Sequence, residues 1–254
     1  MKTIKINNLE LGIGRPKVCI PLIGSSTSEL LEEAANAMAS EADLVEWRID
    51  FFDSTSEITE LERTGRMLRD ILESVPLLIT FRTKDEGGAK SIDTLSYEKV
   101  LGEICERKIA HMIDVEMMKG DETAKRLIAK AREYGVITIG SNHDFEKTPS
   151  KGEIIRRLCK MQELGFDMTK IAVMPRKERD VLDLLDATLA MKETFGDRPF
   201  VTMSMGKIGI ISRMTGECFG SSLTFGTAGA ASAPGQIDAK ELKQILHILH
   251  DDNM

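Results

Sequence analysis

The feature that most constrains the fold is an alternation of strand-like and helix-like stretches along nearly the whole chain. Short apolar, β-branched runs, which are typical of buried strands, alternate with longer runs of helical periodicity. The predicted strands are Val18–Leu22, Leu44–Ile49, Leu77–Phe81, Met112–Val115, Val136–Ser141, Thr169–Met174, Phe200–Ser204 and Ser222–Phe225. The helical patterns are Ser28–Ser40, Ile58–Glu73, Tyr97–Arg107, Asp121–Tyr134, Lys151–Leu164, Glu178–Phe195, Lys207–Gly216 and Asp238–His250. Such alternation predicts an α/β fold with a parallel sheet.

Length favours a closed barrel over an open, doubly wound sheet. The chain has 254 residues, and a (β/α)8 barrel typically uses about 250. No G-x-G-x-x-G follows the first strand, which weakens the open-sheet alternative. Thr3–Ile6 and Leu9–Leu11 flank the turn dipeptide Asn7-Asn8 and predict a hairpin. We therefore predict that residues 1–254 form a single (β/α)8 TIM barrel domain with an N-terminal β-hairpin.

Capping residues give a first estimate of where the helices begin and end. Ser28, Asp121 and Asp238 are candidates for N-caps, because their side chains can accept hydrogen bonds from free backbone N–H groups. Gly135 and Gly165 follow predicted helices and suit the left-handed conformation that often ends a helix.

Composition excludes several classes of function. A net charge of −7 argues against nucleic acid or an anionic membrane as a partner. No stretch approaches the ~20 apolar residues of a membrane span, and the start, M-K-T-I-K-I-N-N, lacks the apolar run of a signal peptide. The four cysteines include no C-x-x-C pair and show no metal-ligand spacing with the histidines. We expect a cytoplasmic protein with reduced thiols and no bound metal.

A lysine inside a predicted strand is the first candidate for chemistry. In D-M-T-K-I-A-V-M-P, residues 167–175, Lys170 shares a face with Ala172 and Met174, and Pro175 ends the strand. A barrel strand is covered on both faces, so a lysine there is unfavourable unless its charge is paired or removed. From this stretch alone, an edge-strand lysine that reaches water is the simpler interpretation.

Charged residues recur where the predicted strands end, which is where barrels carry their sites. In V-E-W-R-I-D, residues 45–50, the alternation puts Glu46, Arg48 and Asp50 on one face. They form either a polar pocket or a self-contained ladder of ion pairs. The next strand ends in Arg82, and Glu86 follows in a glycine-bearing loop where most glutamates are solvated.

Later strands continue this pattern. The fourth strand gives Asp114 and Glu116, which alternate with apolar neighbours. His143 comes at the end of the fifth strand, one βα step before Lys170, and this position favours a functional role over a structural one.

The last two units supply further candidates. Met203 and Met205 share one face of the seventh strand, as pocket wall or as plain core. Arg213 follows in a loop region at residues 211–214. The stretch after the eighth strand, which carries Ser232 and Gln236, is rich in Gly, Ala and Ser and predicts a flexible or phosphate-binding loop.

Taken together, these motifs resemble type I 3-dehydroquinate dehydratase along essentially the whole chain. The motifs that carry the resemblance are V-E-W-R-I-D at 45–50, T-F-R-T-K-D-E-G-G at 80–88, S-N-H-D-F at 141–145, K-I-A-V-M-P at 170–175, S-M-G at 204–206, S-R at 212–213, F-G-S-S-L-T-F-G at 219–226 and A-S-A-P-G-Q at 231–236. Each is weak alone, but all of them in order are specific. No catalytic position departs from the family pattern.

The resemblance implies dehydration of 3-dehydroquinate to 3-dehydroshikimate in the shikimate route to aromatic amino acids. Lys170 matches the lysine that forms an imine with the substrate ketone, an electron sink that acidifies the neighbouring C–H. His143 matches the general base, and Glu86 matches the residue that orients it. The amine attacks only when neutral, and desolvation together with the cations Arg48, Arg82 and Arg213 would favour that form.

The resemblance also implies a substrate-binding set and a homodimer, with no cofactor. Arg213 and Gln236 would hold the substrate carboxylate, since a guanidinium suits a planar anion. The residues that would contact the ring hydroxyls and line the pocket are Glu46, Arg48, Arg82, Ser232, Met203 and Met205. We further predict that residues 227–237 act as a lid, because their small side chains have little apolar area to bury.

Two other functions remain open from the residues themselves. An imine-forming aldolase acting on phosphorylated sugars would need a phosphate site after strands seven and eight, where Arg213 and Gln236 suit a carboxylate better. A non-enzymatic barrel that senses metabolites or serves as a scaffold would fit a chain that had lost the lysine or the histidine, and this chain has both.

Overall fold

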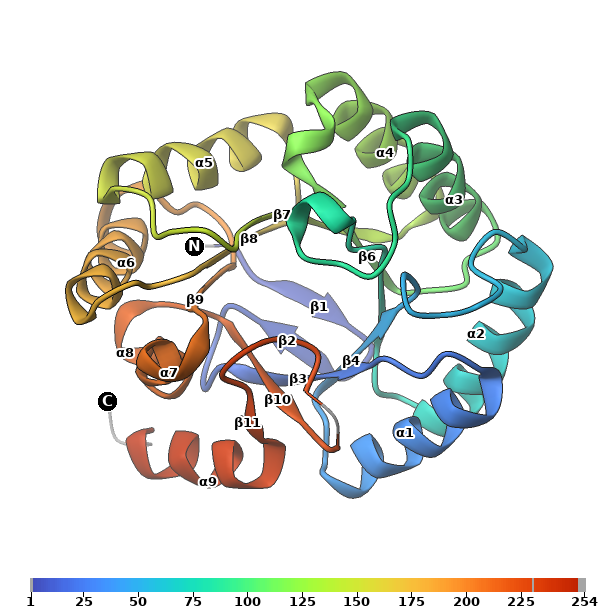
Figure 1. Cartoon of the computed structure of the whole chain (residues 1–254), viewed down its shortest axis with the longest axis horizontal. Coiled ribbons are helices and arrows are strands. Elements are labelled where there is room, and N and C mark those ends of the chain that lie inside the picture. Colours follow the sequence, from blue (N-terminus) through green and yellow to red (C-terminus); the bar gives the residue numbers. More distant parts are fainter. Residues whose placement is uncertain (1, 230, 251–254) are drawn as a thin grey trace.

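The computed structural model describes residues 2–229 and 231–250, and within them parallel strands curl into a barrel surrounded by helices (Figure 1). The main sheet has nine strands in the order β11-β10-β3-β4-β5-β6-β7-β8-β9. Its barrel strands are β3 (Lys17–Leu22), β4 (Leu44–Arg48), β5 (Leu77–Thr80), β6 (Met112–Glu116), β7 (Ile137–Asp144), β8 (Met168–Val173), β9 (Phe200–Ser204) and β10 (Leu223–Thr227), and β11 (Ile237–Asp238) adds to β10. The predicted (β/α)8 barrel is confirmed.

Helices follow the strands in sequence and form the outer layer (Figure 1). They are α1 (Thr27–Ala39), α2 (Ile58–Leu72), α3 (Thr94–Glu106), α4 (Asp121–Tyr134), α5 (Lys151–Leu164), α6 (Glu178–Ala190), α7 (Gly206–Met214), α8 (Gly216–Phe219) and α9 (Ala239–Leu249). Short turns are η1 (Lys84–Glu86), η2 (Met117–Lys119) and the π-helical η3 (Met191–Phe195).

The barrel closes between β9 and β10 through the residues that precede β10. The Ser222 N–H donates to the Phe200 carbonyl at 2.9 Å, and the Lys17 N–H donates to the Ser222 carbonyl at 3.1 Å. Ser222, directly before β10, therefore bonds to β9 on one side and to β3 on the other.

Alternation along each strand separates two apolar layers. Outward residues such as Val45, Trp47, Ile171 and Val173 pack against the helices in one large core. Inward residues at the starts of the strands form a second core inside the barrel: Cys19, Leu44, Leu78, Met112, Ile139, Met168, Val201 and Leu223. This inner apolar layer lies below the polar residues that follow it along the same strands.

The predicted N-terminal hairpin is present and covers the end of the barrel at which the strands begin. Strands β1 (Ile4–Ile6) and β2 (Leu9–Leu11) pair antiparallel, and the hairpin crosses the middle of the ring in Figure 1. Ile6, Leu9 and Leu11 are buried and belong to the inner core. Water is thus excluded from that end, and the opposite end is left for a site.

Some predicted helix boundaries were wrong. Ser26, not Ser28, caps α1, because its side chain and that of Glu29 form a reciprocal capping box. Gly120 precedes α4, so Asp121 is its first residue and not its cap. The predicted caps Asp238, Gly135 and Gly165 are confirmed.

Two further predictions concern the end of the chain. The helix expected over 178–195 changes at residue 191 to the π-helical turn η3. The helix predicted over 207–216 is confirmed as α7, and Arg213, expected in a loop region at 211–214, lies on that helix.

Candidate active site

One cavity at the carboxyl ends of the barrel strands brings together every residue that the sequence marked for catalysis or substrate binding. Those that line it are Glu46, Arg48, Arg82, Glu86, His143, Lys170, Met203, Met205, Arg213, Ser232 and Gln236. Gly87, Phe145, Ala172, Phe225 and Ala233 complete the lining. Residues from most of the barrel strands therefore meet at one point, as the parallel arrangement requires.

Lys170 lies on β8 deep in this cavity, with only 3% of its surface exposed. Its Nζ is 2.8 Å from Asp114 Oδ2 and 3.7 Å from Glu46 Oε1, and it lies over the Phe225 ring at 4.9 Å. The charges closest to the amine are thus carboxylates, and not the guanidinium groups suggested by the sequence. Carboxylates inside the barrel compensate the positive charge of Lys170, so the side chain can be buried without reaching solvent.

Arg82 occupies the centre of a buried network that links β5, β6 and β7. Its Nη2 donates to Asp114 Oδ1 at 2.8 Å, and its Nη1 donates to Glu116 Oε1 at 3.0 Å and to Ser141 Oγ at 3.1 Å. Burial opposes ionisation of Asp114, but Arg82 and Lys170 outweigh it and hold the pKa of that carboxyl well below its usual range. Asp114 is therefore a carboxylate.

His143 is held against Glu86. Glu86 Oε2 lies 2.9 Å from both the backbone N and the Nδ1 of His143, and Asn142 Nδ2 donates to Oε1 at 3.2 Å. Burial, reinforced by Arg82 and Lys170, holds the pKa of His143 well below its usual value. The imidazole is therefore neutral at neutral pH. With Nδ1–H donating to ionised Glu86, Nε2 is left as the basic nitrogen.

Burial is also the largest influence on Glu86. It raises the pKa of this carboxyl to about 7; Arg82 opposes the shift and the Glu116 carboxylate reinforces it. Glu86 therefore changes its charge near neutral pH, beside an imidazole that is already neutral.

The turn η1 brings Glu86 back to the end of its own strand. Gly87 ends the turn in the left-handed conformation at φ 82°, which favours glycine. A Cβ added at Gly87 would lie 2.3 Å from the Phe145 ring, so a larger residue would displace an aromatic side chain that lines the cavity. Gly87 thus permits both the turn that positions Glu86 and the close approach of the Phe145 ring.

Arg213 is the cation of the cavity that has no carboxylate at hydrogen-bonding distance among residues 2–229 and 231–250. It is 2% exposed, its Nη2 donates to the Pro234 carbonyl at 3.3 Å, and its Nε has no hydrogen-bond partner in the described structure. Burial lowers its pKa to about 10, which leaves the guanidinium charged at neutral pH. By contrast, Arg48 binds Asp50 through two bonds of 2.8 Å. Arg213 is therefore free to bind an anion that enters the cavity.

Residues after β10 close one side of the cavity. Gln236 Oε1 accepts from the Ser232 N–H at 2.8 Å, and Gln236 Nε2 donates to Ser232 Oγ at 3.1 Å. The Pro234 carbonyl also accepts from the Gly206 N–H at 3.1 Å. The segment is thus docked on the start of α7, beside Arg213.

Sequence reasoning missed several residues of this site. It noted Asp114 on an alternating strand but gave it no role, and it did not consider Phe225 or Phe145. The alternation of β6 was a usable signal for Asp114, because it places that side chain inside the barrel, as it does Lys170 on β8. The two aromatic residues had no such signal, since either could equally have been core.

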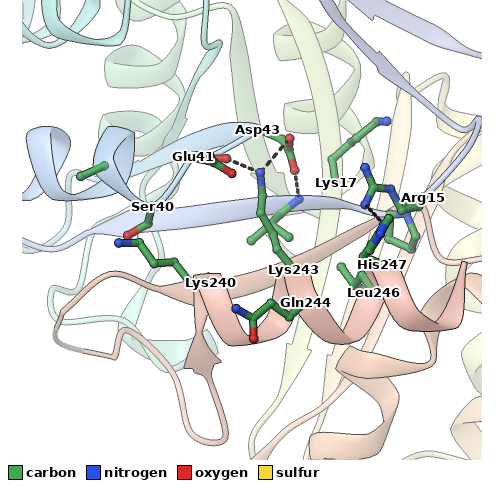
Figure 2. A pocket seen from close by; sticks show the side chains of 13 residues that line it. Arg15, Lys17, Ser40, Glu41, Asp43, Lys240, Lys243, Gln244, Leu246 and His247 are labelled. Atoms are coloured by element: carbon green, nitrogen blue, oxygen red, sulfur yellow. Dashed lines mark hydrogen bonds and ion pairs between the residues drawn. The ribbon is translucent and has the colours of Figure 1, made fainter.

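A second, wider hollow lies at the opposite end of the barrel, between the start of β3 and α9 (Figure 2). Lys243 sits there between the Glu41 carbonyl and the Asp43 carboxylate, as Figure 2 shows, and Arg15 contacts His247. None of the predicted site residues lines this groove. Asp43 also accepts a hydrogen bond from the Val18 N–H at 2.7 Å, which ties the residues before β4 to β3.

The described part of the chain contains no group of three or more His, Cys, Asp or Glu side chains placed to hold a metal ion. Among the same residues, no helix is long and apolar enough to span a membrane.

Comparison with known proteins places the chain in a family. A family model for type I 3-dehydroquinase matches residues 18–253. A 3-dehydroquinate dehydratase of Bacillus licheniformis is 48% identical over 249 residues, or 98% of each chain. A crystal structure of the type I enzyme from Clostridium difficile with covalent modified comenic acid is 46% identical, with a TM-score of 0.95 over 98% of each chain. A 3-dehydroquinate dehydratase from Geobacillus kaustophilus is 34% identical, with a TM-score of 0.94 over 98% of this chain and 96% of that one. The chain belongs to the type I 3-dehydroquinase family.

Proposed function

We propose that this hydro-lyase dehydrates 3-dehydroquinate to 3-dehydroshikimate through an imine on Lys170. The observation that carries the proposal is a buried lysine that shares one cavity with a histidine held by a glutamate. A lysine amine condenses with ketones, and the resulting iminium draws electrons from the adjacent carbon. Relatives named 3-dehydroquinate dehydratase that align over nearly the whole chain support this choice of substrate.

The first step joins Lys170 to the C3 ketone of the substrate. The nitrogen loses a proton, attacks the carbonyl carbon, and the carbonyl oxygen leaves as water. An ammonium and a ketone thus become an iminium and a water molecule, with no net change in charge. The nitrogen is positively charged both before and after the step.

The second step uses the neutral His143. Its Nε2 takes a proton from C2, and the electrons move into the iminium to give a neutral enamine. Ionised Glu86 stabilises the imidazolium that forms. The imidazolium then gives its proton to the C1 hydroxyl, which leaves as water and restores the iminium. Hydrolysis releases the conjugated enone and frees Lys170.

Arg213 supplies the charge that orients the substrate. Its guanidinium is buried and has no carboxylate partner among the described residues, so the substrate carboxylate would complete it. Gln236 would add a second polar contact to the same carboxylate. Glu46, Arg48, Arg82 and Ser232 would bind the ring hydroxyls and the remaining polar edge, and Met203 and Met205 would form the apolar wall.

The wider setting follows from the same assignment. The reaction would serve the shikimate route to aromatic amino acids, in the cytoplasm, without a cofactor. We infer a homodimer from the family resemblance.

The covalent step is tested by borohydride trapping. Incubation with product and borohydride should inactivate the protein and leave one reduced adduct on Lys170, found by peptide mass mapping. Lys170→Ala should abolish the adduct and lower the rate of enone formation, measured by absorbance, by several orders of magnitude. Lys119→Ala, outside the cavity lining, should behave like the wild type. An adduct on another lysine, or none at all, would refute the imine mechanism.

His143→Ala separates binding from chemistry in the same experiment. The variant should still form the adduct, but its turnover should fall about 10²–10⁴-fold, the usual contribution of general acid–base catalysis. Normal turnover would reassign His143 to a structural role.

A further inference from the structure

The Asp114 carboxylate occupies a position that the proposed mechanism has not yet used. It is fully buried on β6. Its Oδ1 accepts hydrogen bonds from Arg82 and Ser141. Its Oδ2 forms an ion pair with Lys170 Nζ at 2.8 Å. One oxygen is thus anchored to the barrel, and the other is aimed at the reacting nitrogen.

We propose that Asp114 is the counter-ion of the Lys170 nitrogen throughout the reaction. This role rests on the proposed function, because it concerns the charge of the imine formed on Lys170. Asp114 would stabilise the ammonium of the free enzyme and then the iminium of the covalent intermediates. It touches the reacting atom and is therefore a catalytic residue.

The charge on the nitrogen explains why a fixed carboxylate is useful. The ammonium and the iminium both carry one positive charge at Nζ, and a preorganised negative charge stabilises each without rearrangement of the site. Proton removal from C2 gives a neutral enamine, and loss of the C1 hydroxyl as water returns the positive charge to Nζ. A carboxylate beside Nζ therefore favours the departure of the hydroxyl.

Glu46 is the other carboxylate near Nζ, and its geometry suits the role less well. Its Oε1 lies 3.7 Å from Nζ and already accepts a hydrogen bond from Thr80 Oγ1 at 2.7 Å. It also lines the cavity, where the substrate would contact it. Asp114 does not line the cavity, so the substrate leaves its contact with Nζ intact.

Asp114→Asn tests the role, with Glu116→Gln as a matched control. Both variants remove a buried carboxylate from Arg82 on the same strand, but only Asp114 contacts Lys170. Asp114→Asn should lower kcat about 10²–10³-fold, the range found when one preorganised electrostatic contact is removed. Glu116→Gln should lower it by a clearly smaller factor.

The amount of adduct trapped by borohydride gives a second readout. Without the Asp114 carboxylate the iminium loses its counter-ion, so the yield of adduct at a fixed pH should fall several-fold. The yield in Glu116→Gln should fall less. Glu46 and the Phe225 ring stay beside Nζ in both variants.

If Asp114→Asn does not fold, as judged by its urea midpoint, Ser141→Ala replaces it. That variant keeps every charge but removes one anchor of Asp114 Oδ1, and it should lower kcat and the trapping rate several-fold together. Unchanged kcat and trapping in whichever variant folds would overturn the role of Asp114 while leaving the imine on Lys170 intact. Failure of the wild type to trap at Lys170 would instead overturn the proposed function.

Discussion

The buried cations of the cavity differ in what they are free to bind. Lys170 and Arg82 are paired with carboxylates of the barrel, so their charges are compensated before any substrate arrives. Arg213 has no such partner within the described residues and can accept the carboxylate of a substrate. A small anion can therefore bind to one cation without disrupting the ion pairs that position the reacting amine.

The pH dependence of turnover should report the pair formed by Glu86 and His143. Burial raises the pKa of Glu86 to about 7, so it is protonated below that pH and ionised above it. Only the ionised form stabilises the imidazolium that His143 becomes. We expect kcat/KM, which reports groups of the free enzyme, to fall as the pH drops through about 7, by up to about tenfold per pH unit for one proton.

Glu86→Gln identifies the group responsible for that fall. The variant should have a lower kcat/KM with a flat profile between about pH 6 and 8, because the titrating carboxyl is gone and His143 stays neutral. Steady-state rates in a single buffer series would measure it. The same acidic limb in the variant would assign the titration to another group.

The inward residues were predictable because a strand has a period of two. That period places Lys170, Glu46 and His143 inside the barrel once the strands are known. It also places Asp114 there, but the contact between Asp114 and Lys170 crosses β7, and sequence order does not report which inward side chains meet. Phe145 could not be predicted, since its position depends on the left-handed turn at Gly87.

At the scale of elements, the accuracy of the predicted helix ends depended on local hydrogen bonds. The cap of α1 was readable, because Ser26 and Glu29 have the spacing of a capping box, yet the apolar pattern favoured a later start. The helical pattern over 207–216 was readable too, and α7, which carries Arg213, packs on β9. Ser212 Oγ illustrates this packing, since it accepts from the Ser204 N–H at 2.9 Å.

The segment 227–237 carries a prediction of its own, because its function as a lid stays untested. Its two ends are anchored, since Ala228 and Ile237 pack against the outer core, whereas polar contacts such as those of the Pro234 carbonyl hold its middle part. Bound product would add contacts to Ser232 and Gln236, so backbone amides from 231 to 237 should exchange more slowly with product than without it. Hydrogen exchange with mass spectrometry measures this, and equal protection in both states would make the segment a fixed wall.

Gln236→Ala tests the same element by kinetics. Loss of a hydrogen bond to a charged group is worth about 1.5–3 kcal/mol, so KM should rise about 10-fold or more with little change in kcat. Gln244→Ala, on α9 in the groove at the far end of the barrel, serves as the control and should leave both constants unchanged. A fall in kcat alone would move Gln236 from carboxylate binding into the chemical step.

At the scale of the whole molecule, the apolar core inside the barrel and the candidate active site lie at opposite ends of its axis. The hairpin and the inner apolar layer fill the end at which the strands begin, and the polar layer and the cavity occupy the other. Because the alternation of strands and helices and the chain length favoured a closed barrel, a site at the carboxyl ends of the strands could be predicted from the sequence. The way in which the hairpin seals the barrel could not, since it depends on the fit of three buried side chains.

Leu11→Ala tests that separation. Leu11 is fully buried in the inner core, and such a truncation typically costs about 2–5 kcal/mol because it leaves a cavity. The urea midpoint should fall accordingly, whereas kcat and borohydride trapping of the folded protein at low temperature should match the wild type. Leu95→Ala on α3, where the side chain is 78% exposed, should change neither. A loss of trapping in folded Leu11→Ala protein would mean that the packing of the inner apolar layer affects the position of Lys170. The two ends of the barrel would then not be independent.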